Sequence, residues 1–491
     1  MILTDLTACE ALALLEKKEI TATELVSAYI AGMAKHKELN AYITETADIA
    51  IAGAKAADER RAKDAKPRAL DGLPIGVKDS FCTKGTLTTC ASKMLYNFIP
   101  GYESTATAKL FDAGVAMLGK TNMDEFAMCG TGLTSHFGAT KNPYSKAGEF
   151  LISAGSSSGS AAAVASGMCI AATGTDTGGS TREPASFCGV VGLKPSYGRV
   201  SRYGVAAMAS SLDTVGIITR DVADAALFLK HMAGRDDRDP TSAPREVPDY
   251  MKSLNQPVKG LKIGVVKEFK NDQIDPEVAA GLENSIALLK AQGAEVVEIS
   301  LPHSLVAMTV YNVIFSEMYS NMSRYDGVRY GFRAEGPFAS LDDMYMKTRG
   351  QGFGKNAKRR IILGSTVMNE KYLEPLFFKA QKVRRLIAND FSAAFASVDV
   401  ILTPTMPIPA PPRTSPLIVN DSYGTWFDMV ALVNLAGLPA ISLPAAKTAS
   451  GLPIGVQLIG KAFDEPTIIK AAHALEKAAK FDNRPSTLMG A

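Results

Sequence analysis

Residues 154–195 read AGSSSGSAAAVASGMCIAATGTDTGGSTREPASFCGVVGLKP and contain two clusters of Gly and Ser. Residues 155–160 and residues 177–180 flank an Ala-rich segment that predicts one helix followed by one short buried strand. Small residues let a ligand approach closely, and consecutive glycines leave backbone N–H groups free to face a developing negative charge. The pattern is typical of an oxyanion hole beside a hydroxyl nucleophile, with Ser156 and Ser180 as the candidate hydroxyls.

Two other uses of Gly/Ser-rich sequence compete with a catalytic one. A flexible linker is disfavoured because residues 161–165 and 187–191 are rich in apolar side chains that belong in a core. A phosphate-binding P-loop requires a Lys directly after its closing Gly, and neither cluster has one. The residues therefore favour a catalytic site over both.

Strand and helix patterns alternate along most of the chain. Residues 75–77 and 115–118 predict strands around a helix at 106–113, and residues 261–301 predict a strand, a helix at 276–292 and a second strand. This alternation indicates an α/β fold with a parallel or mixed sheet that carries helices on its faces. Further predicted elements are two N-terminal helices opened by capping boxes at Thr7 and Thr21, strands at 398–403 and 439–444, and a closing helix at 465–479.

The chain has 491 residues and no segment with the composition of a linker, so we expect one domain over residues 1–491. Its N-terminal helices fall within about residues 1–60. Residues 303–395 are rich in Met, Tyr, Arg and Lys at helical spacing, and they predict a helical layer over the active-site face.

Charge and cysteine usage argue against several classes of function. A net charge of +3 gives no general basic field, so this chain alone is not expected to bind nucleic acid. Its six cysteines are widely spaced without a CxxC pair, which argues against a zinc ribbon or a disulfide framework and for a reducing compartment. The first residues lack a basic n-region, and no apolar run approaches the roughly 20 residues that span a bilayer. We therefore expect a cytoplasmic protein with no metal site and no membrane contact.

A serine nucleophile needs a base, and none of the five histidines lies in a motif that suggests catalysis. His136, in SHFG, is the only one near the Gly/Ser clusters. Lys78 follows the apolar residues 73–77 and so lies at the carboxyl end of a predicted strand, where burial lowers a lysine pKa toward neutrality. Position alone leaves two alternatives open for Lys78, a catalytic base or a surface ion pair with Asp79.

Together these motifs resemble the amidase signature family of serine amidohydrolases. Residues 155–163 and 174–195 carry the signature, and the similarity includes LPIGVKD around Lys78 and GKTNMDEFAM at 119–128. It covers nearly the whole chain, with further similar stretches at residues 201–216, 323–331 and 451–460. The resemblance implies an amidase signature fold, in which a central mixed, largely parallel sheet is covered by helices on both faces.

The resemblance also implies a catalytic mechanism. In this family the nucleophile ends a D-x-G-G-S motif, which falls on Ser180. The first serine of the G-S-S element follows a cis peptide and falls on Ser156, and the family's lysine falls on Lys78. Proton transfer then runs from Ser180 through Ser156 to Lys78. The supporting groups are the oxyanion-hole N–H groups of Thr177, Gly178 and Gly179, the Ser157 hydroxyl near the lysine, and an Asp176–Arg182 pair that holds the loop.

Three residues depart from the family's pattern. Ala154 and Ser158 replace glycines of the common GGSSGGS sequence, and Glu183 stands where Gln is usual. A serine at position 158 would cost about 1–2 kcal/mol if the position required a positive φ. The three catalytic residues are unaltered.

One branch of the family is especially similar, the A subunits of the aspartyl/glutamyl-tRNA amidotransferases. These proteins release ammonia from glutamine through a covalent glutamyl-enzyme, for amidation of mischarged Glu-tRNA(Gln) or Asp-tRNA(Asn). The branch implies a heterotrimer with B and C subunits, in which tRNA binds mainly through the B subunit. ATP and Mg²⁺ are used by the partner subunit, so no cofactor is expected in this chain.

The branch also implies residues that bind glutamine. An arginine of a GFGK…RRIxLG motif binds the α-carboxylate, and the motif falls on residues 352–364. Arg360 or Arg359 is the candidate, and the alternative is that this segment is a basic surface turn. Tyr311 matches a tyrosine of the pocket, and Glu125 matches the acid at the start of the ammonia passage.

An acid for the α-amino group is expected seven positions before Asn434, where this chain has Phe427. Asp428 lies one place later, and we take it as the ligand of the amino group. Without such an acid, glutamine selectivity would be weakened.

Two other functions remain open from the sequence. A stand-alone amidase for small carboxamides would keep Ser180, Ser156 and Lys78 but would need neither Arg360 nor a partner protein. An inactive scaffold protein is disfavoured because the three catalytic residues are intact.

Overall fold

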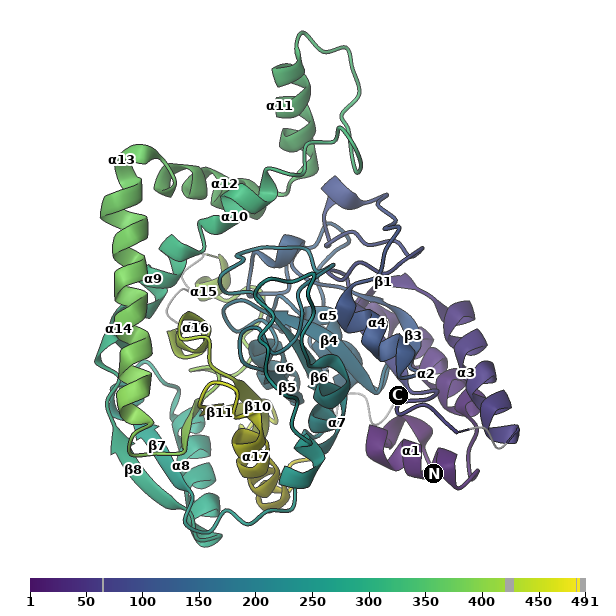
Figure 1. The fold of residues 1–491 in the computed structure, drawn as a ribbon, viewed down its shortest axis with the longest axis vertical. Helices are drawn as coiled ribbons and strands as arrows, with labels where there is room; N and C mark the ends of the chain where they lie inside the picture. Colours follow the sequence, from purple (N-terminus) through teal and green to yellow (C-terminus); the bar gives the residue numbers. More distant parts are fainter. Residues whose placement is uncertain (64–65, 420–427, 483, 486–491) are drawn as a thin grey trace.

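The computed structural model describes residues 1–63, 66–419, 428–482 and 484–485. A single mixed sheet of 11 strands runs through it (Figure 1), which confirms the α/β prediction. From one edge of the sheet to the other, the strands are β1 (Tyr42–Glu45), β3 (Ala116–Thr121), β2 (Pro74–Lys78), β4 (Ala171–Asp176), β6 (Thr214–Thr219), β5 (Val191–Lys194), β10 (Ala440–Lys447), β11 (Pro453–Gly460), β9 (Val400–Pro404), β7 (Lys262–Val266) and β8 (Glu295–Ile299).

The sheet is mixed, but the expectation that it is largely parallel is wrong. Parallel pairs lie toward the two ends of the sheet, where β2 pairs with β3 and β4, and β7 pairs with β8 and β9. From β4 through β6, β5, β10 and β11 to β9, each neighbouring pair is antiparallel. Part of the reason for the antiparallel pairs is the length of the segments that connect the strands. Parallel strands need a crossover of about a dozen residues or more, whereas residues 448–452 join β10 to β11 and permit only a hairpin.

Helices cover both faces of this sheet. β2, β3, β4, β5, β6, β9 and β11 are buried at every position, which requires cover on each face. The helices of this part of the chain are α1 (Ala8–Glu16), α2 (Ala22–Lys35), α3 (Ala47–Ala62), α4 (Thr105–Asp112), α5 (Ser158–Ala165), α6 (Arg182–Cys188), α7 (Val222–Met232), α8 (Pro276–Ala291), α15 (Pro416–Val419), α16 (Asp428–Leu435) and α17 (Glu465–Ala479).

Several local predictions are confirmed. α1 and α2 begin after capping boxes, in which the hydroxyls of Thr7 and Thr21 accept a backbone N–H three residues later. α5 and β4 are the helix and buried strand predicted within residues 154–195. β7, α8 and β8 form the predicted strand–helix–strand unit, with ends displaced by a residue or two. The predicted closing helix at residues 465–479 is α17.

Residues 302–394 are mainly helical and lie beside the sheet rather than in it. In Figure 1, α14 runs along one side of the molecule, and α11 projects away from the body. None of the helices in the described ranges is both long and apolar enough to cross a membrane. The helices of this segment are α9 (Ala307–Ile314), α10 (Glu317–Met322), α11 (Leu341–Gly352), α12 (Lys355–Val367), α13 (Glu370–Tyr372) and α14 (Lys379–Ala394).

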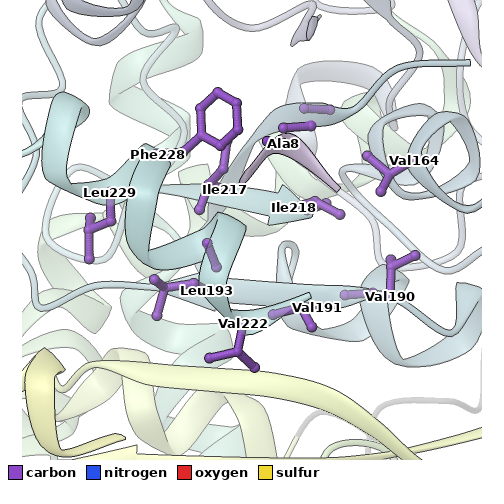
Figure 2. Close-up of a cluster of buried hydrophobic side chains, with 14 of the residues drawn as sticks. Ala8, Val164, Val190, Val191, Leu193, Ile217, Ile218, Val222, Phe228 and Leu229 are labelled. Carbon is purple, nitrogen blue, oxygen red and sulfur yellow. The ribbon is translucent and has the colours of Figure 1, made fainter. Parts of the chain in front are cut away.

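The main hydrophobic core lies between the sheet and the helices packed on it. Figure 2 shows part of this core, where Phe228 and Leu229 of α7 lie near Ile217 of β6. Val164 of α5 and Leu193 of β5 belong to the same buried cluster. The polar ends of β2 and β4 therefore project from a close-packed apolar body, which restricts their movement.

A buried carboxylate ties α1 to α7. Asp224 Oδ2 accepts the N–H of Ala8 at 2.6 Å, and Oδ1 accepts the N–H of Cys9 at 3.0 Å. We expect Asp224→Ala to lower the free energy of unfolding by about 1–3 kcal/mol, because it leaves two donors of the α1 N-terminus unpaired. Thermal unfolding and hydrogen exchange of the α1 amides measure this effect.

The matched control is Asp112→Ala on α4, where the side chain is exposed. It should change the free energy of unfolding by no more than about 0.5 kcal/mol. Equal losses for the two variants would contradict the role given to Asp224.

Candidate active site

The candidate catalytic residues gather at one edge of the sheet. β2 ends at Lys78, and the parallel strand β4 ends at Asp176, so the two residues emerge on the same side. α5 begins at Ser158, directly after the first Gly/Ser cluster, and α6 begins at Arg182, directly after the second. Crevices outside the carboxyl ends of strands are the usual ligand sites of α/β sheets.

Lys78 is fully buried among hydroxyl groups. Its Nζ lies 2.8 Å from Ser156 Oγ, 2.8 Å from Ser157 Oγ and 2.7 Å from Thr175 Oγ1. Burial lowers the pKa of Lys78 to about 7, because removal of water disfavours the ammonium form. The alternative of a surface pair with Asp79 is excluded, since both residues are buried and Asp79 instead faces Lys120, with 3.7 Å between Oδ1 and Nζ.

Lys78 Nζ donates to the hydroxyl oxygens of Ser156, Ser157 and Thr175 and also lies 3.4 Å from the carbonyl oxygen of Thr175, and the neutral amine is the form that can act as a base. Such an amine has two N–H donors and one lone pair, whereas an ammonium has three donors and no acceptor. Ser157 Oγ donates to the carbonyl oxygen of Thr175 at 3.3 Å, so it accepts from Lys78. The hydroxyl of Thr175 takes the second donor. In the structure Nζ donates to Ser156 Oγ at 2.8 Å, and in the neutral amine a lone pair at the same distance can accept the Ser156 proton.

Ser156 and Ser180 lie in two segments that are joined by a backbone hydrogen bond. Ser157 N–H donates to Ser180 C=O at 3.1 Å. Ser156 has no solvent exposure and follows a cis peptide bond from Gly155, whereas 8% of Ser180 is exposed. Ser180 therefore lines the pocket, whereas Ser156 lies beneath the surface beside Lys78.

Of the two residues that replace family glycines, Ala154 rather than Ser158 has the backbone conformation that favours glycine. Ser158 is the first residue of α5 and does not have a positive φ, so no cost arises there. Ala154 instead has a φ of +54°, a conformation that costs a residue with a Cβ about 1–2 kcal/mol. Gly155 has no room for a side chain, because an added Cβ would lie 1.9 Å from Asp124 Oδ2.

Asp176 organises the turn that carries the nucleophile. Its Oδ1 accepts the N–H of Gly179 at 2.8 Å, and its Oδ2 accepts the N–H of Thr181 at 3.1 Å. The Gly179 N–H is thus already engaged. Within the described part of the chain, the N–H groups of Thr177 and Gly178 form no hydrogen bond. These two predicted oxyanion donors are the ones available to a ligand.

A buried network fixes Asp176 in turn. Arg182 forms two contacts of 3.0 Å with its carboxylate and also donates to Asn434 Oδ1 at 2.7 Å and to Gln457 Oε1 at 2.8 Å. Burial alone would raise the pKa of Asp176, but Arg182 lowers it to about 2. No role for Asn434 or Gln457 was predicted from the sequence, although Gln457 lies in one of the stretches that resemble the family.

A pocket opens above Ser180, and two predicted substrate residues line it. Tyr311 packs against the loop so closely that a Cβ on Gly178 would lie 2.6 Å from its ring. Arg360 lies over the ring of Phe315 at 5.2 Å, and its Nε is 3.3 Å from Asn356 Oδ1. The lining residues are Ala127, Met128, Cys129, Gly130, Gly178, Ser180, Glu183, Met308, Tyr311, Asn312, Phe315 and Arg360.

The remaining predicted substrate residues lie outside this lining. Arg359 is exposed, so Arg360 is the member of the pair that reaches the pocket. Asp428 Oδ1 accepts the N–H of Met308 at 3.1 Å, which puts it directly behind a lining residue. Burial raises the pKa of Asp428 to about 6. Phe427 lies outside the described residues.

Glu125 lies beside the pocket rather than in its wall. Its Oε1 accepts the Ser92 hydroxyl at 2.5 Å, and its Oε2 accepts the N–H of Gly354 at 2.9 Å. Gly354 immediately precedes α12, which carries Arg360. Burial raises the pKa of Glu125. The carboxyl group therefore links the residues after β3 to α12, the helix that carries Arg360.

Comparisons with known proteins find relatives over nearly the whole chain. A family model described as Amidase matches residues 24–469. The A subunit of the Parvibaculum lavamentivorans glutamyl-tRNA(Gln) amidotransferase is 50% identical to this chain, with 98% of each chain covered. The corresponding protein of Neisseria meningitidis is 49% identical, with 96% of this chain and 98% of that one covered.

Solved structures show the same relationship. The crystal structure of the A subunit of the Thermotoga maritima glutamyl-tRNA(Gln) amidotransferase matches with a TM-score of 0.78 at 35% identity, covering 97% of this chain and 95% of that one. A structure described as an amidase matches with a TM-score of 0.81 at 28% identity, covering 96% and 99%.

The position of Lys78 predicts how Ser180 reactivity depends on pH. Because only the neutral amine accepts a proton, labelling of Ser180 by a fluorophosphonate should rise with pH, with a midpoint near 7. Below the midpoint, the rate should fall about tenfold per pH unit. Lys78→Met should slow labelling on the order of 100-fold or more at all pH values.

His136→Ala is the control, since His136 lies outside the pocket lining. It should leave the labelling rate within a few fold of that of the unsubstituted protein, and it should leave the pH midpoint near 7. A histidine variant as slow as Lys78→Met would overturn the assignment of the base.

Proposed function

The chain belongs to the amidase family, and we propose that it is the glutamine-hydrolysing component of an amidotransferase that acts on mischarged Glu-tRNA(Gln). The observation that carries this proposal is the pocket that joins a serine nucleophile to an arginine, Ser180 to Arg360. A guanidinium matches a free carboxylate, which glutamine has and a simple carboxamide lacks. The full-length similarity to curated A subunits supports the same function.

In the first half of the proposed reaction, Ser180 Oγ attacks the side-chain carboxamide carbon of glutamine. Its proton passes to Ser156 Oγ, while the Ser156 proton passes to the lone pair of Lys78 Nζ. The carbonyl oxygen becomes an oxyanion that the N–H groups of Thr177 and Gly178 stabilise. Collapse of this intermediate returns the proton to the nitrogen through Ser156, releases ammonia and leaves a glutamyl ester on Ser180.

The second half consumes one water molecule. Lys78, neutral again, accepts through Ser156 the proton of a water that attacks the ester carbon. Return of that proton to Ser180 Oγ releases glutamate and restores the resting state. The balance is glutamine plus water giving glutamate plus ammonia, with no net change in the protein.

Specificity for glutamine is proposed to come from the pocket wall. Arg360 binds the α-carboxylate, Tyr311 borders the side chain, and Asp428 receives the α-amino group. Met308 separates Asp428 from the cavity, so this last contact needs a small movement of the residues around Met308. Glu125 is proposed to lie at the start of the path that ammonia follows after release.

The other subunits would complete the reaction. We propose that B and C subunits join this chain in a heterotrimer, that tRNA binds mainly through the B subunit, and that the complex is cytoplasmic. ATP and Mg²⁺ would be used by the partner subunit, and this chain would need no cofactor. Relatives named for glutamyl-tRNA(Gln) favour that substrate over Asp-tRNA(Asn). Their full-length similarity disfavours a stand-alone amidase, and the intact site disfavours an inactive scaffold.

Removal of the nucleophile tests the enzymatic assignment. Ser180→Ala should lower glutaminase turnover on the order of a millionfold, since the covalent path is lost. Ammonia release by the purified protein measures this loss. Residual turnover within a few hundredfold of the unsubstituted protein would show that another residue is the nucleophile.

Two pocket substitutions separate the glutaminase from a general amidase. Arg360→Ala and Asp428→Asn should each raise the KM for glutamine on the order of 100-fold, because each leaves a charged group of the substrate unpaired. Both should have much less effect on propionamide, which carries neither charge. Steady-state kinetics on the two substrates decide the question.

Arg359→Ala is the matched control for Arg360, because its side chain is exposed. If Arg360→Ala and Asp428→Asn leave glutamine kinetics unchanged while propionamide remains a good substrate, the general amidase is the correct function.

A further inference from the structure

Glu183 is a buried acid whose carboxyl group has no partner within the described residues. Only 1% of the residue is exposed, and in that part of the chain neither Oε1 nor Oε2 has a hydrogen bond. The side chain nevertheless lines the pocket that contains Ser180. Buried polar groups are nearly always satisfied in folded proteins, so an unpaired one that faces a pocket points to a ligand.

The carboxyl group lies directly beside the catalytic turn. A Cβ built on Gly179 would lie 1.9 Å from Glu183 Oε1, so the oxygen packs against the residue that precedes the nucleophile. Gly179 has a φ of +130°, a conformation that suits glycine. The acid is therefore close to the turn that carries Ser180, in the wall of the same pocket.

The charged groups around Glu183 favour its neutral form. Burial, followed by the charge of Asp176, raises the pKa of Glu183 well above its usual range. Arg182 acts in the opposite direction, but its hydrogen bonds go to Asp176, Asn434, Gln457 and the carbonyl of Val430, and within the described residues none goes to Glu183. Among the described residues, further titratable or charged groups near this region are Asp124 after β3, Cys129, Asp213 before β6, Tyr311 on α9 and Arg360 on α12.

We propose that the protonated carboxyl group of Glu183 donates a hydrogen bond to the oxygen of the reacting carboxamide, as a side-chain member of the oxyanion hole. This assignment rests on the proposed hydrolysis of carboxamides at Ser180. The O–H supplements the N–H groups of Thr177 and Gly178, because the N–H of Gly179 is engaged by Asp176. Ionised Glu183 would repel the oxyanion instead, so catalysis needs the neutral acid.

Two opposing titrations follow from this arrangement. Lys78 must be neutral to accept a proton, so kcat/KM rises with pH through about 7. Glu183 must keep its proton, so kcat/KM falls again at higher pH. The profile is therefore bell-shaped, and its two limbs belong to different residues.

Glu183→Gln tests the alkaline limb, because a carboxamide keeps an N–H donor at every pH. In a profile measured from about pH 6 to about pH 10, we expect kcat/KM of the unsubstituted protein to fall about tenfold per pH unit above its upper break. Glu183→Gln should keep the acid limb and lose the alkaline one. Glu283→Gln is the control, since this exposed glutamate on α8 undergoes the same change of charge.

Glu183→Ala separates a contact with the reacting group from a contact with the amino-acid part of glutamine. Loss of one oxyanion donor should lower kcat on the order of 100-fold for glutamine and propionamide alike, with little change in KM. A loss confined to KM for glutamine would overturn the proposed contact. The measurements use the full chain with any subunits that copurify.

An identical alkaline limb in the unsubstituted protein and in Glu183→Gln would also overturn the inference. Infrared spectroscopy of the unsubstituted protein gives a test that does not depend on the variants. A protonated carboxyl band should be present at neutral pH and shift when a substrate amide binds, and its absence would contradict the proposal. Failure of the unsubstituted protein to release ammonia from glutamine would instead count against the proposed function, because propionamide still reports on Glu183.

Discussion

The burial of the Lys78 amine among hydroxyl groups is the interaction on which the site depends. Acids surround it at longer range, namely Asp124, Asp176 and Asp213, but within the described residues none forms an ion pair with Nζ. Desolvation therefore dominates and brings the pKa to about 7. A direct carboxylate contact would hold the amine in its ammonium form and leave the serines without a base.

At Asp176, by contrast, the charged form of a buried group is stabilised. It is equally buried, but Arg182 contacts it twice and keeps it ionised. The charged acid can then hold the N–H groups of Gly179 and Thr181 and set the shape of the turn. One buried group thus titrates near neutral pH, and its neighbour is kept charged and holds the loop. The presence of an ion pair at Asp176, and its absence at Lys78 within the described residues, makes the difference.

Much of this site could be predicted from the sequence because its key signals are local. The apolar residues 73–77 place Lys78 at a strand end, and the two Gly/Ser clusters identify the segments of both serines. The contacts of Asn434 and Gln457 could not be predicted, because they depend on where α16 and β11 lie relative to the end of β4. Strand order depends on such long-range pairing, which is also why the largely parallel sheet was a wrong expectation. The unpaired state of Glu183 likewise appears only after the donors of Arg182 have been assigned.

The lack of space around the catalytic glycines has an evolutionary consequence. A Cβ added at Gly155, Gly178 or Gly179 would lie only 1.9–2.6 Å from a side-chain atom of another residue. These glycines therefore tolerate almost no substitution. Evolutionary changes in substrate specificity have to occur at other residues. The opposing wall of the pocket comes from α9 and α12, helices that lie outside the sheet, so a changed side chain there need not alter the backbone of the turn. A lineage can diversify its substrates there while its reaction chemistry stays constant.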